Sequence, residues 1–537
     1  MSRPRVVVAT DPKGDFSYKE IVALRGEVNS ILNTIPISSS ATGFQVNWKA
    51  PNEKSLVSRK MRIKGTLSFQ FNWTPNATTS IIRVAPRQYA FHQLASTWQF
   101  WVNNQGMGGQ SFGEFAVPVM KYMGDMIESN TIGSATLGDY WTEYSNATGR
   151  SVTNVIGDSV DCEKGRAGWS GFSVTNTKGT TAGTSQTSVV TINFDEPFLF
   201  GGCFSLLKDA PALTNVSILQ WAVNYSSNLQ RLISVAFTDS STLGASSTFS
   251  PSGSGLLTNA SILVESFDPS PFMKLPERAF YPVDRYDFQQ SPTITGCSGS
   301  TAIASPFVSP VITCPAVPSR MYCFVKPSQL SYSATDSDFL ALITSLQVTF
   351  DSKPLLTTYD LNGLYQLSLN NGFKSVFNDR AYALGYANII NSNGVPSKAG
   401  VTSAGLCLVF GKDIVLPDGV VTGSQGQHTI QVIAQATNQS TTTYSLALDV
   451  VLVYDEILEV SQSTALVMPV NVTVAESVQE GERVPSQELT HGVAGGGLVY
   501  GRKTGFGGSK SGGTHGGTHG GSHGGSSRKS LKSRLRR

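Results

Sequence analysis

The pattern that most constrains the fold of this chain is a two-residue alternation of apolar and polar side chains. Phe44, Val46 and Trp48 alternate with Gln45 and Asn47. Four later runs repeat the pattern: Leu67, Phe69, Phe71 and Trp73; Leu346, Val348 and Phe350; Ile430, Val432 and Ala434; and Leu446, Leu448, Val450, Leu452 and Tyr454. Successive side chains of a strand point to opposite faces, so each run predicts a strand with one buried face. Because Ser-, Thr-, Gly-, Asn- and Pro-rich segments separate the runs and helical periodicity is scarce, we expect an all-β chain of sandwich or barrel type.

A proline cluster divides the strand-rich region into two parts. Pro269, Pro271 and Pro276 lie close together, and strand alternation is present on both sides of them. The two parts, residues 29–268 and 269–474, are each long enough for one elaborated eight-stranded jelly roll. We therefore expect two consecutive jelly-roll barrels with long loops.

The two ends of the chain differ from this region. Residues 1–28 include the one stretch that could be helical, residues 18–28, and we interpret them as an N-terminal arm. Strand alternation stops after Val474, and 16 of the 52 glycines follow Thr490. Such dense glycine carries much backbone entropy and little apolar surface. Residues 475–537 are therefore expected to form a disordered, Gly- and His-rich C-terminal tail.

Charge is distributed unevenly along the chain. The formal net charge is only +3, yet no Asp or Glu follows Glu488. Residues 1–500 hold 31 basic and 37 acidic side chains and sum to −6. The remaining nine cations all lie in the tail: Arg502, Lys503, Lys510, Arg528, Lys529, Lys532, Arg534, Arg536 and Arg537. Only 14% of all residues are charged, against roughly 25% in ordinary soluble domains, which suits a body whose surface is neutral or covered by other copies.

The basic tail has two functional interpretations beside that of a solvated charge run. Lys and Arg release counterions from nucleic acid, and nine phosphate contacts would give a log–log salt slope of about −8. A short basic cluster at a chain end is also typical of a nuclear import signal. The tail histidines, His515, His519 and His523, are spaced four residues apart. We interpret them as part of a flexible spacer rather than a metal site, because glycine leaves the ligands unorganised.

Cysteine usage and the N-terminus indicate a reducing compartment. The six cysteines are Cys162, Cys203, Cys297, Cys314, Cys323 and Cys407, without a CxxC pair. No signal peptide and no apolar stretch of 18 residues is found. We expect free thiols, no passage through the endoplasmic reticulum and an unglycosylated sequon at Asn76.

Catalytic signatures are nearly absent, and we predict neither catalytic residues nor cofactor or metal sites. Only His92 and His428 occur within residues 1–490, and HExxH and GxSxG motifs are missing. The Gly157-Asp158-Ser159 segment has no histidine nearby in the sequence. The chain is therefore not expected to be an enzyme.

One segment superficially resembles a phosphate-binding loop. Gly405 and the Gly411-Lys412 pair are separated by five residues instead of four, and Asp413 replaces the hydroxyl that would reach magnesium. We interpret the segment as a strand followed by a turn at residues 416–419.

Several segments, in order, resemble a known family. They are residues 36–40, 44–48, 50–52, 57–59, 86–91, 197–200 and 219–224 in the first part, and 275–276, 280–282, 318–325, 364–368, 416–419 and 444–454 in the second. Together they resemble the double jelly-roll major capsid proteins of virophages and polinton-like viruses, with adenovirus hexon as a distant relative. The chain departs from the family at Ser58, where the family usually has Asp, which puts an Asp-based salt bridge there in doubt.

The resemblance implies a structural protein of an icosahedral virion. It implies a pseudo-hexagonal homotrimer of six barrels, neighbouring capsomers, penton and minor capsid proteins as partners, and the genome as a possible partner of the tail. Assembly would take place in the host nucleus or cytoplasm. Residues 493–497 also resemble the Gly-Gly-x sites of adenovirus-type maturation proteases, so cleavage between Gly496 and Gly497 competes with a simple glycine linker.

Two other functions remain open at this point. One is a single jelly-roll coat protein with a protruding β domain, which would form true pentamers and hexamers. The other is a carbohydrate-binding or carbohydrate-active β-sandwich, which predicts paired carboxylates in a cleft. No spacing in the sequence identifies such a pair.

Overall fold

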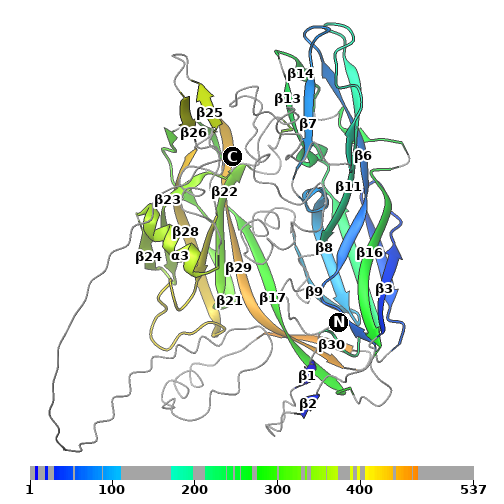
Figure 1. Ribbon diagram of the computed structural model, residues 1–537. Helices are drawn as coiled ribbons and strands as arrows, with labels where there is room; N and C mark the ends of the chain where they lie inside the picture. Colours follow the sequence, from blue (N-terminus) through cyan, green and yellow to red (C-terminus); the bar gives the residue numbers. More distant parts are fainter. Residues whose placement is uncertain are drawn as a thin grey trace, which may run out of the picture. The chain divides into compact units, whose positions relative to one another are not determined.

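The computed structural model describes most of the strand-rich region (Figure 1). The described residues are 7–9, 19–21, 29–52, 55–87, 89–110, 171–197, 212–237, 239–245, 248–253, 255–268, 275–298, 301–327, 333–334, 340–358, 360–372, 387–390, 396–399, 405–438, 443–461 and 464–469. Strands dominate these ranges, and the predicted all-β, double jelly-roll fold is confirmed. No helix within them is long and apolar enough to cross a membrane.

The first barrel consists of two antiparallel sheets. One sheet has the order β10-β11-β6-β16-β3, and the other has the order β4-β12-β8-β9. The strands of the larger sheet are β3 (Asn29–Pro36), β6 (Arg62–Thr74), β10 (Phe172–Val174), β11 (Gln186–Pro197) and β16 (Leu257–Asp268), with β14 (Thr242–Leu243) and β15 (Ser250–Pro251) on β6 and β5 (Leu56–Val57) on β16. Those of the smaller sheet are β4 (Gly43–Lys49), β8 (Ala95–Val102), β9 (Gln105–Gln110) and β12 (Ile218–Tyr225).

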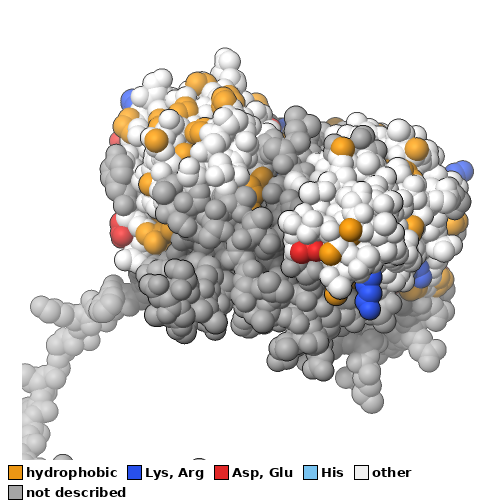
Figure 2. All heavy atoms as spheres, turned by 90° about the horizontal axis from the view of Figure 1, so that it is seen from above, with side chains coloured by type: hydrophobic (Ala, Val, Ile, Leu, Met, Phe, Trp, Pro, Cys, Tyr) orange, Lys and Arg blue, Asp and Glu red, His pale blue; other side chains and the backbone are white. Residues whose placement is uncertain are grey.

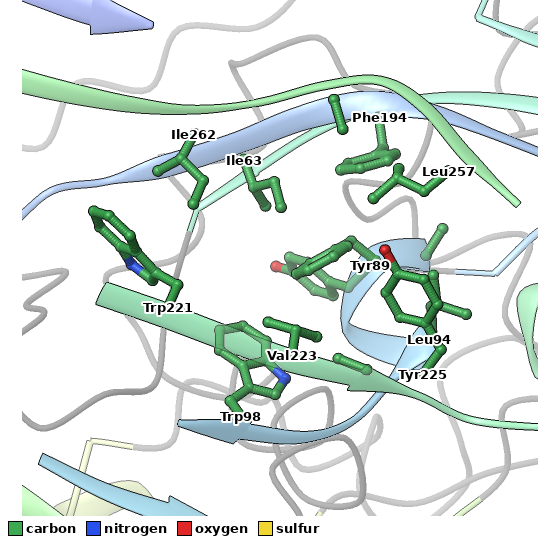
Figure 3. Close-up of a cluster of buried hydrophobic side chains, with 14 of the residues drawn as sticks. Ile63, Tyr89, Leu94, Trp98, Phe194, Trp221, Val223, Tyr225, Leu257 and Ile262 are labelled. Carbon is green, nitrogen blue, oxygen red and sulfur yellow. The ribbon is translucent and has the colours of Figure 1, made fainter. Parts of the chain in front are cut away.

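The inward-facing side chains of these sheets form the first core. Phe69, Phe71 and Trp73 of β6 are completely buried, as the alternation predicts. Figure 3 shows Trp98, Trp221 and Val223 of the smaller sheet facing Ile63, Phe194 and Ile262 of the larger one, with Tyr89 and Leu94 beside them. Helix α1 (Ala90–Leu94), the 3-10 helix η5 (Leu229–Leu232) and the pair of strands β7 (Ile82–Pro86) and β13 (Ile233–Phe237) complete this part.

The second barrel has the same construction. Its sheets have the orders β17-β29-β22-β27 and β19-β28-β23-β24. The first contains β17 (Arg278–Gln290), β22 (Arg320–Pro327), β27 (Leu406–Val409) and β29 (Tyr444–Ser461), with β18 (Ile294–Cys297) and β30 (Thr464–Pro469) also on β29. The second contains β23 (Leu342–Phe350), β24 (Lys353–Thr358) and β28 (Gln425–Asn438), and β19 (Thr301–Ala302), β20 (Phe307–Val308) and β21 (Ile312–Ala316) follow one another along β28.

Helix α3 (Leu361–Asn370) was not predicted. Asp360 caps its N-terminus by accepting hydrogen bonds from the backbone N–H groups of Asn362 and Gly363. Leu364 is buried in the second core, and Leu367, three residues later, packs against that core. This spacing, after an N-capping Asp, was the helical signal in the sequence.

Two short hairpins lie outside the barrels' main sheets. One pairs β25 (Ala387–Ile390) with β26 (Pro396–Ala399), and the other pairs β1 (Val7–Ala9) with β2 (Lys19–Ile21). Within the stretch that could have been helical, residues 18–28, the described residues 19–21 form a strand instead. The β-branched valines of β1 provide a strand edge, and β2 satisfies its backbone groups by pairing with that edge.

Candidate functional site: the seam between the two barrels

The side chains singled out in the tail lie outside the described residues. This applies to Arg502, Lys503, Lys510, Arg528, Lys529, Lys532, Arg534, Arg536 and Arg537, to Gly496 and Gly497, and to the tail histidines. It also applies to Gly157, Asp158 and Ser159. What the described residues do bring together is an extensive contact between the barrels, which we call the seam. It consists of the outer face of the sheet β17-β29-β22-β27 and the first-barrel side chains that cover it.

The centre of the seam is apolar because β22 and β29 are buried on both faces. Leu448, Val450 and Leu452 of β29 point into the second core, whereas Val451 and Val453 join the core of the first barrel. Tyr322 and Phe324 of β22 also join the core of the first barrel. A fully buried side chain of this size contributes about 1.5–3 kcal/mol, so the seam is held as firmly as a core.

Tyr281 of β17 extends the apolar contact toward the far end of the strands. It is buried with Val283, Leu458 and Val460 in the same cluster. Its hydroxyl accepts a hydrogen bond from the backbone N–H of Thr214 at 2.8 Å and lies 3.0 Å from the Thr214 hydroxyl. Burial raises the pKa of Tyr281, so the phenol stays neutral and its polar end is satisfied by the first barrel.

Two asparagines join the barrels through backbone carbonyls. Asn103 lies in the two-residue turn between β8 and β9 and is 5% exposed. Its side-chain amide donates to the carbonyls of Asn215, at 2.9 Å, and of Thr464 in β30, at 3.3 Å. The Asn215 amide donates in turn to the carbonyl of Pro276 at 2.9 Å. Both residues have positive φ, 47° and 56°, a conformation that Asn tolerates better than most residues.

Two buried arginines make equivalent links at other points of the seam. Arg59 Nη2 donates to the carbonyl of Pro282 at 2.9 Å. Arg87 donates through Nε to Ile233, at 2.8 Å, and through Nη2 to the carbonyl of Ser333, at 2.9 Å. Their long side chains reach between segments that are far apart in the sequence, and the carbonyl oxygens satisfy charges that would be costly to bury alone.

The seam also contains charged pairs on the second barrel. Lys326 Nζ lies 3.0 Å from Asp449 Oδ2, and both side chains are almost completely buried. Gln290 donates to the other carboxylate oxygen of Asp449 at 2.7 Å. Because removing one partner would leave a buried charge uncompensated, this pair fixes the alignment of β17, β22 and β29 more than it adds net stability.

The second barrel matches a family model. Residues 287–456 match the model described as "Major capsid protein V20 C-terminal domain". The second barrel is therefore similar to the C-terminal domain of that capsid protein family. The predicted resemblance is thereby confirmed. In a double jelly roll, the seam is the joint between the two barrels.

A capsid protein sequence and two solved capsid structures are also similar to this chain, the structures in fold. The putative capsid protein V20 of Sputnik virophage is 27% identical over 325 residues, which are 56% of this chain and 49% of that protein. The chain thus spans about half the length of the curated relative that it matches. A chain of the Sputnik virophage structure superposes with a TM-score of 0.71 at 20% identity, covering 91% of this chain and 96% of that one. The mavirus major capsid protein gives a TM-score of 0.64 at 15% identity, covering 91% and 99%.

The structure shows what the segment that superficially resembled a phosphate-binding loop, residues 405–413, forms in the second barrel. Leu406–Val409 forms β27, and a turn follows in which Gly411 has a φ of 78°. Lys412 Nζ donates to the carbonyl of Asn370 at 3.2 Å and to the side chain of Asn371 at 2.7 Å. The lysine therefore caps the C-terminus of α3, where a cation is favourable. The predicted turn at residues 416–419 is also present, since the Val420 N–H donates to the Pro417 carbonyl at 3.0 Å and Gly419 has a φ of 78°, so the interpretation as a strand followed by this turn is confirmed.

The two histidines of the body lie in separate barrels. His92 Nδ1 is 2.8 Å from Glu196, and both side chains are completely buried in the first barrel. His428 Nδ1 is 2.8 Å from Asp351, at one end of the second barrel. The described ranges contain no group of three or more His, Cys, Asp or Glu side chains that could hold a metal ion.

Several residues that join the two barrels at the seam were not identified from the sequence. Arg59 and Arg87 lay in segments quoted for the family resemblance, but no role was assigned to them. At Ser58, where the family usually has Asp, the hydroxyl accepts a hydrogen bond from the Lys60 backbone N–H at 3.2 Å. The one available signal for the seam was the nearly unbroken apolar run of β29, which indicates a strand buried on both faces.

Proposed function

We propose that this protein is the major capsid protein of an icosahedral virus shell and that it assembles as a homotrimer of six barrels. The seam carries the proposal, because a buried apolar joint holds two barrels of equal strand order together within one chain. A trimer of such chains offers six similar barrels and therefore a pseudo-hexagonal outline. Neighbouring capsomers, penton and minor capsid proteins are its proposed partners, in the virion.

The proposed domain limits follow the strands. Residues 29–268 would form the first jelly roll, since β16 ends at Asp268, and residues 269–474 the second, since β17 begins at Arg278. Residues 1–28 would serve as an N-terminal arm and residues 475–537 as the tail. Two barrels of matching strand order favour this arrangement over a single jelly roll with a protruding domain.

A low surface charge supports the proposal of extensive contacts between copies. Figure 2 shows few Lys, Arg, Asp or Glu side chains among the described atoms of the face in view. Depletion of charge at the centre is typical of protein interfaces. The proposal includes no catalytic activity and no cofactor.

Imaging and mass measurement of the purified full-length chain test the assembly. We expect particles or capsomers whose mass corresponds to three chains and whose outline is hexagonal. Pentamers and hexamers of single chains would contradict the double-barrel capsomer, and hydrolysis of glycans by the purified protein would contradict a purely structural role.

The tail is proposed to contact the genome or an import receptor through its nine cations. Full-length chain and a variant ending at residue 500 can be compared in a DNA-binding salt titration. We expect a log–log slope approaching about −8 for the full chain and a much shallower one for the variant. Equal slopes would exclude the tail as the DNA contact, and nuclear accumulation of a fluorescent fusion to residues 501–537 would test import separately.

Maturation cleavage between Gly496 and Gly497 is a second proposal for the same segment. Its support is the resemblance of residues 493–497 to Gly-Gly-x protease sites. Mass spectrometry of mature particles would show a C-terminus at Gly496 if cleavage occurs. An intact Arg537 in every particle would contradict it.

A further inference from the structure

The correspondence between the two barrels extends to individual strands. The first barrel has the sheets β3-β16-β6-β11 and β4-β12-β8-β9, and the second has β17-β29-β22-β27 and β21-β28-β23-β24. In each barrel a short extra strand also pairs with the end of the last strand. β5 pairs with β16 at Ser266 and Phe267, and β30 pairs with β29 from Glu456 to Ser461. Therefore β5 occupies in the first barrel the place that β30 occupies in the second.

The correspondence also holds for one corner of each smaller sheet. The turn between β8 and β9 has φ values of 47° and 66° at Asn103 and Asn104, and the turn between β23 and β24 has 46° and 64° at Asp351 and Ser352. Asn103 exchanges hydrogen bonds with Ile218. Its backbone N–H donates to the Ile218 carbonyl at 2.9 Å, and its Oδ1 accepts from the Ile218 backbone N–H at 3.2 Å.

Asp351 makes the same exchange with Thr429 in β28. Its N–H donates to the Thr429 carbonyl at 2.9 Å, and its Oδ1 accepts from the Thr429 N–H at 2.8 Å. Asn103 and Asp351 are therefore equivalent positions in the two barrels. Within the described residues, the hydrogen bonds of Asp351 stay inside the second barrel, whereas those of Asn103 reach Thr464 of the other barrel.

The two corners differ in exposure. Asn103 is 5% exposed and donates to the carbonyl of Thr464 in β30, across the seam. The Asp351 side chain is 40% exposed, and its Oδ2 is held by His428 of its own barrel. The opposite ring nitrogen of His428, Nε2, is shielded from solvent and makes no hydrogen bond within the described part of the chain. The second barrel thus presents a preformed corner whose Asp351 side chain the described part of the chain leaves partly exposed.

We propose that the Asp351–His428 corner contacts the first barrel of a second copy, at the end where β5 pairs with β16. This inference rests on the proposed function, and it assigns the contact between subunits to named residues. The intermolecular contact repeats the seam, with β5 of the second copy in the place of β30. A head-to-tail contact of this kind is heterologous and closes into a ring when the rotation allows.

The exchange of Asn for Asp changes the chemistry that the partner must supply. The Asn103 amide donates to a carbonyl, whereas the Asp351 carboxylate only accepts and therefore requires an N–H donor or a cation. Lys60 and Lys64 are both exposed and follow β5 in the sequence. They supply cations near β5, at an end of the barrel that also carries Glu265 and Asp268 of β16.

Carbodiimide cross-linking of wild-type protein tests the contact directly. The reagent joins a carboxylate to a lysine amine without a spacer, so it reports contact between the two groups. In oligomers assembled from equal amounts of ¹⁴N- and ¹⁵N-labelled chains, we expect mixed-isotope peptides that join Asp351 to Lys60 or Lys64. Oligomers whose Asp351 yields no such intermolecular peptide would overturn the inference while leaving the proposed function intact.

Substitution provides a second measurement. We expect Asp351→Lys to raise the concentration at which the oligomer dissociates at least tenfold, as measured by analytical ultracentrifugation. Asp418→Lys is the matched control, because it makes the same charge change in an exposed turn of the same barrel, and it should leave dissociation unchanged. Combining Asp351→Lys with Lys60→Asp and Lys64→Asp should restore part of the affinity.

A folding defect can be separated from loss of contact. Asp351→Asn keeps the acceptor for Thr429 and should preserve the thermal melt, yet it should weaken the oligomer several-fold because the charge is lost. If Asp351→Lys and Asp418→Lys dissociate at the same concentration as wild type, the inference is wrong. If wild-type protein itself remains monomeric at all concentrations, the proposed function fails, and this contact fails with it.

Discussion

Asn103 links three segments of the chain through a single side chain. Its Oδ1 accepts from the backbone of Ser217, at 2.8 Å, and its amide nitrogen donates to Asn215 and Thr464. Thr464 is 361 positions away in the sequence, and no local pattern predicts a contact over that distance. The sequence predicted a turn-rich all-β chain, but these long-range hydrogen bonds depend on how the barrels pack.

We expect Asn103→Asp to destabilise the protein. The change keeps the turn and the acceptor oxygen, but it replaces the donor with a carboxylate oxygen that faces two carbonyls. Leaving such buried groups unsatisfied costs roughly 1–3 kcal/mol, measurable by urea denaturation. Asn104→Asp is the control, because Asn104 lies in the same turn and is exposed; an equal loss in both variants would assign the effect to the turn instead.

Glu456 predicts a pH dependence at the residue scale. Burial raises its pKa, although Arg285, 3.3 Å away, opposes the shift. A carboxyl with a raised pKa holds its proton longer in the folded state, so stability falls as pH rises from about 4.3, its unfolded value, through the folded pKa. Glu456→Gln should flatten this decline in melts between pH 4 and 7, and an unchanged slope would exclude Glu456 as its source.

Strand β29 shows at the element scale how far sequence patterns reach. Its alternation correctly predicted that Leu446, Leu448 and Val450 face one core. The apolar residues Val451 and Val453 on the opposite face of the strand join another core, which alternation alone does not predict. Helix α3 was missed for a related reason, since a short apolar run can suit a strand or a helix and only the Asp360 cap distinguishes them.

Val451 and Val450 provide a matched pair on the two faces of β29. Val451→Asp puts an unpaired carboxylate into the seam, so we expect calorimetry to resolve two unfolding transitions, one for each barrel. Val450→Ala leaves a cavity in the second core, which costs about 1–3 kcal/mol, and should lower the melting temperature of the second barrel. A single unsplit transition in Val451→Asp would show that the barrels are coupled by contacts other than those of Val451.

On the scale of the whole molecule, charge and fold are separated along the chain. The strand-rich body carries the seam and both cores, whereas the cations of the tail follow it without interspersed acids. The sequence predicted this separation directly, because charge is read from composition. It could not predict the joint between the barrels, which is formed by side chains of both sheets at once.

We expect capsomer formation to be independent of the tail. A chain ending at residue 500 keeps every strand that the structure describes, so light scattering should give the same number of subunits as for the full chain. Particles containing DNA should become rarer, because the −6 body repels polyanions. A truncated chain that is monomeric under conditions where the full chain is oligomeric would contradict this expectation.

The four described cysteines are buried free thiols on strands of the second barrel: Cys297, Cys314 and Cys323 lie in its core, and Cys407 of β27 faces the seam. Burial raises the pKa of each, to about 11 for Cys314 and about 12 for Cys407. Only the thiolate reacts with alkylating reagents, so labelling must wait until the barrel opens. The alkylation rate of these thiols therefore reports how often the second barrel opens, and it can be measured for a free subunit and for one within a shell.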